Sequence, residues 1–367
     1  MSFEDIQRKK HRKGLGGLFS YCEDEKGKRF SVLGLPLWRE YVEQDRCIRS
    51  VLGIRTGWNP RYDDTNYTPV PHISDEILLR ELNAIGAFTY IPNPGNMGDM
   101  LIAASTILFF DKYRLPYTLK RDTSRMDVVV YGGGGIWLGM YKKVWKKLLP
   151  TFRNAKRVII LPSSFSDCDE LLGEMDERFV VFCRELQSYN YLLKANTKAK
   201  IILDHDMAFR APREILGMQT QPSFRVLNKA RKACEALMSM HSKIGHFFRR
   251  DVESLHHIDK GIDLSRFING RMNSSRKHIM FAAQFMLCAL DGYDVIITDR
   301  LHVGIAAYLM NKEVYLLDNS YKKISSVYHH SLESERVHLV QEVPEIHTCN
   351  HTATRNTELL CEYIMAQ

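Results

Sequence analysis

Short apolar runs alternate with longer amphipathic stretches along most of the chain. In the first half, runs rich in Val and Ile occupy residues 87–91, 127–131, 158–161, 179–182 and 201–203. Polar or turn residues bound each run, which is typical of strands buried on both faces. The stretch between the first two runs has helical spacing over about 98–112. This alternation predicts an α/β fold with a parallel sheet.

The same pattern returns in the second half of the chain. Strands are expected at residues 245–249, 294–298 and 314–318, and helices over about 276–290 and from residue 301 onward. The stretch 211–232 contains two prolines and several polar residues, so we expect the connection between the halves there. The pattern therefore predicts two Rossmann-like domains.

The expected domain boundaries follow from these elements. We expect an N-terminal extension at 1–82, a first Rossmann-like domain at 83–215, a second at 216–345 and a C-terminal tail helix at 346–367. The extension is rich in charged and aromatic residues, and its pattern predicts no element. A chain of 367 residues with 45% hydrophobic content is large enough for more than one core.

Cysteine spacing and hydropathy together indicate the compartment in which the protein resides. The eight cysteines form no CxxC pair and no zinc-binding spacing, so we interpret them as free thiols and expect no metal site. The sequence has neither a signal-peptide apolar core nor an apolar stretch of about 18 residues that would span a membrane. These observations predict a cytoplasmic protein.

A net charge of +8 favours an anionic partner. Nucleic acid, a membrane surface and a phosphorylated metabolite all satisfy that requirement. The one concentrated basic run covers residues 8–13, and we interpret it as a solvated terminal segment. The alternative is a peripheral contact of this run with the inner face of a membrane, or with another polyanion.

Loops that follow the strands are the first places to search for a site, because ligands of open α/β sheets bind there. After the first strand, Asn96, Gly98 and Asp99 open a helix whose free N–H groups suit an anion or a sugar hydroxyl. The alternative is an ordinary helix cap. After the second strand come Gly132 and then Gly133, Gly134 and Gly135, which favour close approach of a ligand to the backbone. The glycine run is not a P-loop or a dinucleotide fingerprint, and a flexible turn is the alternative.

Arg184 follows the run at 179–182, with Ser188 one helical turn further on. Its planar fork of donors matches a carboxylate or a phosphate, and a structural salt bridge to Glu185 or a neighbouring residue is the alternative. Asp299, Arg300, Leu301 and His302 follow the strand at 294–298. Histidine transfers protons near neutral pH, so His302 is the strongest catalytic candidate, with a structural hydrogen bond as the alternative.

Taken in order, these segments resemble the polysaccharide pyruvyl transferase family. The resemblance spans about residues 90–325. Its segments are residues 95–99, the glycines 132–135, Arg184 and Glu185 with Ser188, residues 206–208, residues 249–251 with Glu253, residues 298–302, and residues 319–321 with Lys322 or Lys323.

The resemblance implies a glycosyltransferase-B-like arrangement of the two domains. It also implies that phosphoenolpyruvate is the donor substrate and that two hydroxyls of a sugar receive its pyruvyl group as a cyclic ketal. No cofactor is implied. We expect His302 to be the general acid, with Asp299 or Asp99 as its partner. The expected donor-binding residues are Arg184, Arg249, Arg300, Leu301, Lys322, Lys323, Gly133, Gly134 and Gly135, and the expected acceptor-binding residues are Asn96, Gly98, Ser188 and Asn319.

Two alternative functions remain open from the sequence. A nucleotide-sugar-dependent glycosyltransferase would share the fold and the basic cleft, and would differ in its donor. A polyanion-binding module without activity would leave the glycine run and the Arg300 and His302 pair without a role. For the transferase we expect a sugar or a lipid-linked oligosaccharide as acceptor, and no nucleic acid partner.

Overall fold

The computed structural model describes strand residues between 10 and 60 and most of the chain after residue 72. Beyond residue 72 it describes residues 73–120, 127–216, 218, 223–239, 242–251, 254–255, 258, 260–268, 275–319, 322–346, 361 and 364–365. The chain divides into two compact units. One comprises residues 1–64 with 216–221, and the other comprises residues 65–215 with 222–367.

The first unit contains an antiparallel sheet in which each strand pairs with the next along the chain. Its strands are β1 (Lys10–Gly14), β2 (Phe19–Asp24), β3 (Gly27–Val32), β4 (Leu35–Glu43), β5 (Arg46–Val51) and β6 (Ile54–Pro60). Cα partners include Phe19 with Val32 and Trp38 with Val51. The sequence pattern predicted no element here, because pairing between neighbouring strands uses backbone groups that every residue has. Residues 10–13 of the basic run lie in β1, and residues 8 and 9 lie outside the described residues.

The second unit begins with a parallel sheet that confirms the predicted α/β class. Its order is β13-β12-β11-β9-β7-β8, and β10 pairs with β11. Tyr90 and Ile159 are both register partners of Val130. The strands are β7 (Phe88–Ile91), β8 (Tyr117–Leu119), β9 (Val128–Tyr131), β10 (Gly134–Leu138), β11 (Arg157–Ser166), β12 (Phe179–Cys183) and β13 (Lys200–Leu203).

The strand order reverses at β7. The chain goes from β7 to β8 on one side and then returns to β9 on the other side. Such a switch point leaves a crevice beyond the carboxyl ends of the two central strands. The loops after β7 and β9 contain Asn96 and the glycine run, and both begin at this place.

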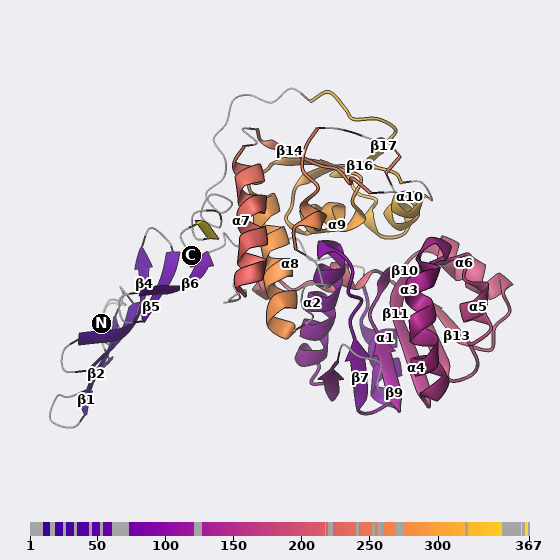
Figure 1. The fold of residues 1–367 in the computed structure, drawn as a ribbon, viewed down its shortest axis with the longest axis horizontal. Helices are drawn as coiled ribbons and strands as arrows, with labels where there is room; N and C mark the ends of the chain where they lie inside the picture. The colour runs from indigo at the N-terminus through magenta and orange to yellow at the C-terminus, as the bar shows by residue number, and fades with distance from the viewer. Residues whose placement is uncertain are drawn as a thin grey trace, which may run out of the picture. The chain divides into compact units, whose positions relative to one another are not determined.

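A second parallel sheet has the order β14-β15-β16-β17, of which Figure 1 labels β14, β16 and β17. Val295 pairs in register with Ile244 on one side and Glu313 on the other. The strands are β14 (Ile244–Phe247), β15 (Val295–Thr298), β16 (Glu313–Leu317) and β17 (Val337–Val340).

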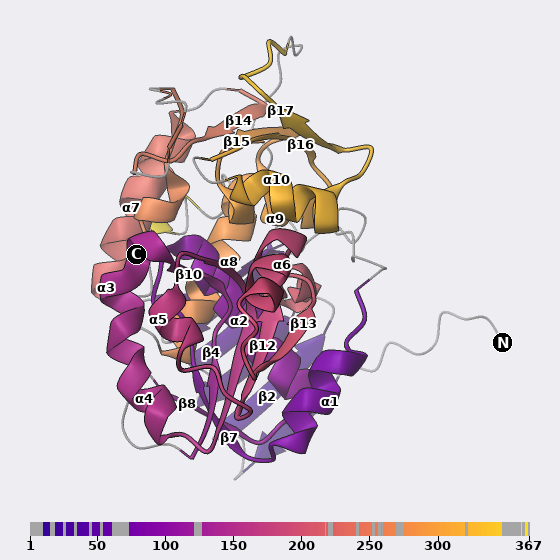
Figure 2. The same ribbon diagram turned by 90° about the vertical axis from the view of Figure 1, so that its right-hand side faces the viewer.

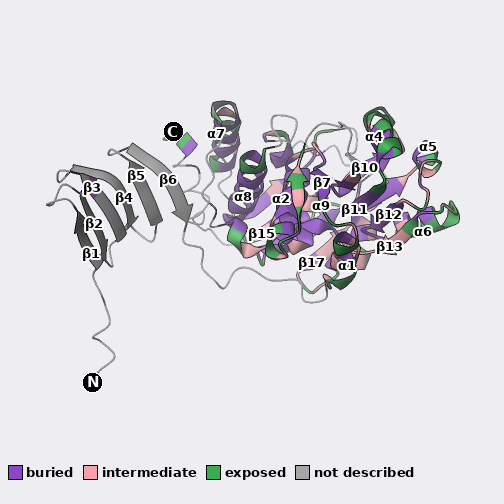
Figure 3. Ribbon diagram, turned by 90° about the horizontal axis from the view of Figure 1, so that it is seen from below, coloured by how far each residue is buried: buried purple, intermediate pink, exposed green. Residues whose placement is uncertain are grey.

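Two long apolar helices pack against each other between these sheets. In α2 (Met97–Lys112) every residue from Met97 to Ile107 is buried, and in α8 (Arg276–Asp291) every residue from His278 onward is buried. A helix that is apolar on all sides requires cover on all sides, which explains this central position (Figure 3). The other helices are α1 (Glu76–Ala84), α3 (Lys142–Trp145), α4 (Leu149–Asn154), α5 (Asp169–Leu172), α6 (Leu186–Lys194), α7 (Phe224–Met238), α9 (Leu301–Leu309) and α10 (Lys323–Val327).

The predicted strands and helices of both halves are confirmed, with shifts of a few residues at their ends. The predicted connection at 211–232 stays a prediction, and its second part contains the start of α7, which begins at Phe224. Buried Val226, Ala230, Ala233 and Leu237 recur there with helical spacing, a signal that the two prolines obscured. Most of the predicted tail helix at 346–367 lies outside the described residues. The domain boundaries within the second unit stay predictions, and no helix in the described residues is long and apolar enough to cross a membrane.

Candidate active site

A cavity of about 440 Å³ lies at the switch point, within the second unit. Its walls come from the loops after β7, β14 and β15, from β10, from residues 141–144 and 265–266, and from the starts of α9 and α10. The lining residues are Asn93, Pro94, Gly95, Asn96, Asp99, Gly135, Ile136, Tyr141, Val144, Arg249, Asp251, Ser265, Arg266, Arg300, Leu301, His302 and Lys323. Segments that are far apart in the sequence therefore meet here.

The start of α2 forms one wall through a closed set of hydrogen bonds. Asn96 accepts the N–H of Gly98 at 2.8 Å, and Asp99 accepts the N–H of Asn96 at 2.7 Å. The other oxygen of Asp99 accepts from the side chain of Asn93 at 2.9 Å. Burial raises the pKa of the Asp99 carboxyl, although the positive charge of His302 opposes that shift. The predicted helix cap is therefore present, and Asn96 and Asp99 also line the cavity.

The glycine run is partly strand and not a free turn, because β10 begins at Gly134. Gly134 has a φ of +125°, a conformation that only glycine adopts without strain. Gly135 lines the cavity, and a Cβ there would lie 3.3 Å from Lys323 Nζ and 3.5 Å from Arg184 Nη2. Gly133 packs against the carbonyl oxygen of Pro162 instead of lining the cavity.

Arg184, Asp206 and His302 form a buried group that we call the Arg184 cluster. Arg184 follows β12, has no exposed surface and donates to Asp206 Oδ2 at 2.6 Å and to Ser164 Oγ at 2.8 Å. The predicted alternative of a salt bridge is therefore observed, with Asp206 and not Glu185 as the partner. His302 Nε2 lies 3.3 Å from Asp206 Oδ2 and 3.5 Å from Arg184 Nη1. Arg184 Nη2 is buried and has no hydrogen-bond partner within the described residues.

Asp206 contacts both Arg184 and His302. Burial by itself would raise the pKa of Asp206, but the hydrogen bond and charge of His302 and the charge of Arg184 outweigh it and hold the pKa below its usual range. Its second oxygen accepts the N–H of Ala208. Sequence reasoning assigned no role to Asp206, and its place in an ordered set of family segments was the only signal.

Gly98 allows His302 to approach α2. A Cβ at Gly98 would lie 2.7 Å from both Cβ and Cγ of His302, closer than nonbonded carbon atoms approach. The glycine therefore provides space for the imidazole next to the helix start.

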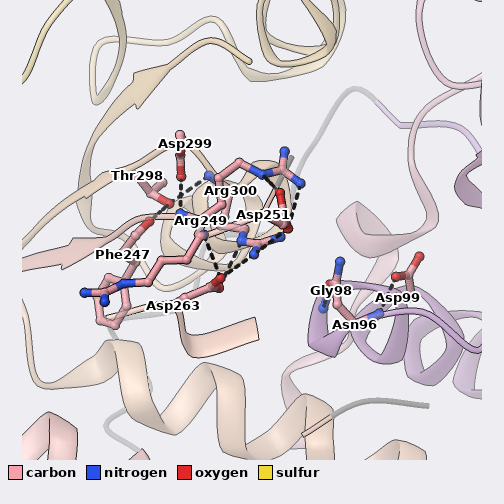
Figure 4. A network of polar contacts seen from close by, with 11 residues as sticks. Asn96, Gly98, Asp99, Phe247, Arg249, Asp251, Asp263, Thr298, Asp299 and Arg300 are labelled. Atoms are coloured by element: carbon pink, nitrogen blue, oxygen red, sulfur yellow. Dashed lines mark hydrogen bonds and ion pairs between the residues drawn. The ribbon is translucent and has the colours of Figure 1, made fainter. Parts of the chain in front are cut away.

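Two arginines and two carboxylates form a second group, the Arg300 cluster (Figure 4). Arg300 donates to Asp263 at 3.1 and 2.6 Å and forms an ion pair with Asp251 at 2.9 Å. Arg249 donates to the other oxygen of Asp251 at 2.8 Å. In Figure 4 this cluster is seen together with the start of α2, where Asn96 and Asp99 are labelled. Asp251 follows Arg249 closely in the sequence, whereas nothing in the sequence pointed to Asp263.

Eight predicted site residues do not line the cavity: Gly98, Gly133, Gly134, Arg184, Ser188, Asp299, Asn319 and Lys322. Asp299 accepts the backbone N–H of Arg249 at 2.7 Å, and burial raises the pKa of its carboxyl to about 6. Ser188 accepts the N–H of Phe165 at 2.7 Å and donates to Glu185. Asn319 accepts the N–H of Lys323 at 3.0 Å, and Lys322 is an exposed residue with a φ of 55° before α10. Of the two predicted lysines, only Lys323 lines the cavity.

No group of three or more His, Cys, Asp or Glu side chains within the described part of the chain is placed to hold a metal ion. The cavity instead combines histidine, arginine and lysine side chains with an aromatic and aliphatic wall at Ile136, Tyr141 and Val144. Such a set suits an anionic ligand that lies beside a less polar one.

Comparisons with known proteins agree with this arrangement. The chain is similar in structure to an uncharacterised protein from Klebsiella pneumoniae subsp. pneumoniae NTUH-K2044, with a TM-score of 0.60 and 28% sequence identity. The match covers 73% of this chain and 97% of that one. No match was found among curated proteins. The sequence pattern of polysaccharide pyruvyl transferases matches residues 96–321, a segment that includes both arginine clusters and the start of α2. The chain therefore belongs to the polysaccharide pyruvyl transferase family.

Proposed function

We propose that this protein transfers the pyruvyl group of phosphoenolpyruvate to two hydroxyls of one sugar residue. The bond between C2 of the donor and the phosphate oxygen breaks, and two bonds form from C2 to the sugar oxygens. One hydroxyl proton ends in the new methyl group and the other leaves with inorganic phosphate. The product is a cyclic ketal.

The observation that best supports this proposal is the unpartnered Nη2 of Arg184. This nitrogen lies near Gly135, where Lys323 Nζ also approaches the cavity wall. A buried donor without a partner costs stability unless a ligand completes its hydrogen bond. A carboxylate or phosphate oxygen above Gly135 would satisfy it, and the Arg300 cluster would face the opposite charged end of the donor.

His302 is the proposed general acid. His302 lines the cavity, and Asp206 lies 3.3 Å from its Nε2 and orients the ring for proton transfer to the methylene carbon of the donor. Asp99 lines the cavity beside α2, whereas Asp299 supports the backbone of Arg249. We therefore favour Asp99 over Asp299 as the partner that accepts a hydroxyl proton.

The acceptor is proposed to be a sugar or a lipid-linked oligosaccharide, with Asn96 at its binding wall. The two parallel sheets beside one cavity support a glycosyltransferase-B-like arrangement. The cytoplasmic location and a membrane contact by residues 8–13 stay predictions.

The decisive experiment measures inorganic phosphate released from phosphoenolpyruvate with and without a panel of pyranosides and polyprenyl-linked oligosaccharides. We expect release only with an acceptor, because the cavity must keep water from the donor. Equal release in both conditions contradicts the transferase reaction. Melting temperature measured with phosphoenolpyruvate and with nucleotide sugars provides the control, since stabilisation by a nucleotide sugar alone would favour the glycosyltransferase alternative.

A further inference from the structure

A basic and apolar helical segment borders the cavity. It consists of η3 (Gly139–Tyr141), α3 and η4 (Lys146–Leu148), which follow one another without a break. Tyr141 and Val144 of this segment line the cavity. The segment therefore forms part of the cavity wall and part of the molecular surface, along one side of the second unit (Figure 2).

One face of this segment exposes apolar side chains. Met140 is 47% exposed and Val144 is 40% exposed, whereas Trp145 is fully buried. Lys143 and Lys147 are exposed as well. Residues three and four apart lie on the same side of a helix, so Met140, Lys143, Val144 and Lys147 form one face, which we call the rim face.

The lysines of the segment divide into two pairs. Lys142 and Lys146 both form ion pairs with Glu170, at 2.6 and 2.8 Å. Lys143 and Lys147, on the rim face, have no ion pair in the part of the chain that the structure describes. The rim face therefore combines positive charge that no carboxylate offsets with exposed apolar surface.

We propose that the rim face docks on an anionic phospholipid bilayer and places the cavity mouth at the membrane surface. Lysines attract anionic headgroups, and short apolar side chains between them enter the boundary with the acyl chains. A soluble polyanion would use the lysines and leave the exposed side chain of Met140 without a role. A second copy of the chain would require a much larger apolar area than two side chains offer. This proposal is independent of the pyruvyl transfer reaction.

The test is flotation of the full chain with vesicles of phosphatidylcholine alone and of phosphatidylcholine with phosphatidylglycerol. We expect binding to the anionic vesicles only. The double variant Lys143→Gln and Lys147→Gln should bind them roughly 10–30-fold more weakly, from the loss of two lysines near the surface. Met140→Ser should weaken vesicle binding roughly threefold, while binding to dextran sulfate should stay unchanged.

The matched control is the double variant Lys156→Gln and Lys198→Gln. It removes the same charge from lysines that are each 75% exposed and paired with an acid, so vesicle binding should stay close to that of the unmodified chain. Melting temperatures verify that all variants fold. Absence of binding by the unmodified chain overturns the proposal. If both double variants lose vesicle binding equally, binding depends only on net charge. If binding is unchanged without Lys143 and Lys147, the membrane contact lies elsewhere on the protein. Either result also overturns the proposal.

Discussion

The two arginine clusters of the cavity differ in how their charges are balanced. In the Arg300 cluster two carboxylates, Asp251 and Asp263, hold two arginines. In the Arg184 cluster a single carboxylate, Asp206, contacts both Arg184 and His302, and one nitrogen of Arg184 has no partner among the described residues. Both clusters contribute to the wall of the same cavity, through Arg249 and Arg300 in one and His302 in the other, but only the Arg184 cluster retains a buried donor without a partner among the described residues.

This difference suggests separate tasks. A ligand anion at the Arg300 cluster must compete with the carboxylates that already contact its arginines. This cluster is therefore better suited to form the cavity wall. An anion at the Arg184 cluster completes an unsatisfied group and lies beside an imidazole. We therefore expect changes in the Arg184 cluster to affect chemistry and stability more than changes in the Arg300 cluster.

The largest effect is expected for His302→Ala. Turnover should fall roughly 10²–10⁴-fold, the usual contribution of a positioned acid, while donor affinity changes little. Steady-state kinetics with phosphoenolpyruvate and an acceptor measure both quantities. His329→Ala is the control, because that side chain is 63% exposed, contacts Glu333 and the ring of Tyr328, and does not line the cavity. Normal turnover of the His302 variant would exclude the general acid role.

Asp206→Ala should lower the free energy of unfolding by about 3–5 kcal/mol, because it leaves the buried Arg184 without its carboxylate. Chemical denaturation measures this loss. Glu170→Ala removes a surface carboxylate that also contacts two cations and is 46% exposed, so its effect should stay within about 1 kcal/mol. Similar losses of unfolding free energy in the two variants would show that the buried ion pair contributes no more to stability than the surface pair.

Gly98→Ala should displace the His302 ring, since the new methyl group would lie 2.7 Å from two of its carbons. A misplaced catalytic group loses up to about 10²-fold in turnover, and we expect a decrease of that order. Gly173→Ala is the control because its nearest neighbour would lie 3.6 Å away. Unchanged turnover of Gly98→Ala would show that the ring position next to α2 is not required.

Lysine substitutions compare the clusters directly. Arg300→Lys keeps the charge but loses the planar fork, and donor binding should weaken by about 1–3 kcal/mol. Arg184→Lys should weaken it by more, because the lysine cannot replace the buried Nη2. Titration calorimetry with phosphoenolpyruvate measures both. A larger loss at Arg300 would reverse the tasks that we assign to the clusters.

The smallest effect is expected from Asp299→Asn. Burial raises the pKa of this carboxyl from 3.8 to about 6, so the folded state binds more protons than the unfolded state between these values. Its contribution to stability is therefore lost as the pH rises through that window. The neutral variant still accepts the N–H of Arg249 and should be more stable by about 1–2 kcal/mol at pH 7. The melting temperature of the variant should exceed that of the unmodified chain at pH 7 and equal it near pH 4. A difference that does not change with pH would show that ionisation of Asp299 is not its cause.

Much of the fold and part of the site were predictable from the sequence. Buried strands of Val and Ile and the apolar helices α2 and α8 have local patterns, because an element covered on both faces must be apolar throughout. Polar residues directly after such strands lie at the carboxyl edge of their sheet. Asn96 and Asp99 were therefore predicted at the edge of the first sheet, and Arg249, Arg300 and His302 at the edge of the second, and all five line one cavity.

The remaining features depended on tertiary contacts. Asp263 and Asn93 have no sequence signal, and each acquires its partner only when separate loops meet. The resemblance placed Ser188, Asn319 and Lys322 at the site, but none of them lines the cavity, because local spacing does not determine side-chain direction at a loop. The pairing of β1 to β6 was unpredicted for a related reason, since backbone hydrogen bonds between neighbouring strands leave little trace in residue type. The sequence by itself determined the buried elements and the edge at which the polar residues gather. Tertiary structure decided which charges share a partner, because an ion pair depends on distances between segments and not on their order in the chain.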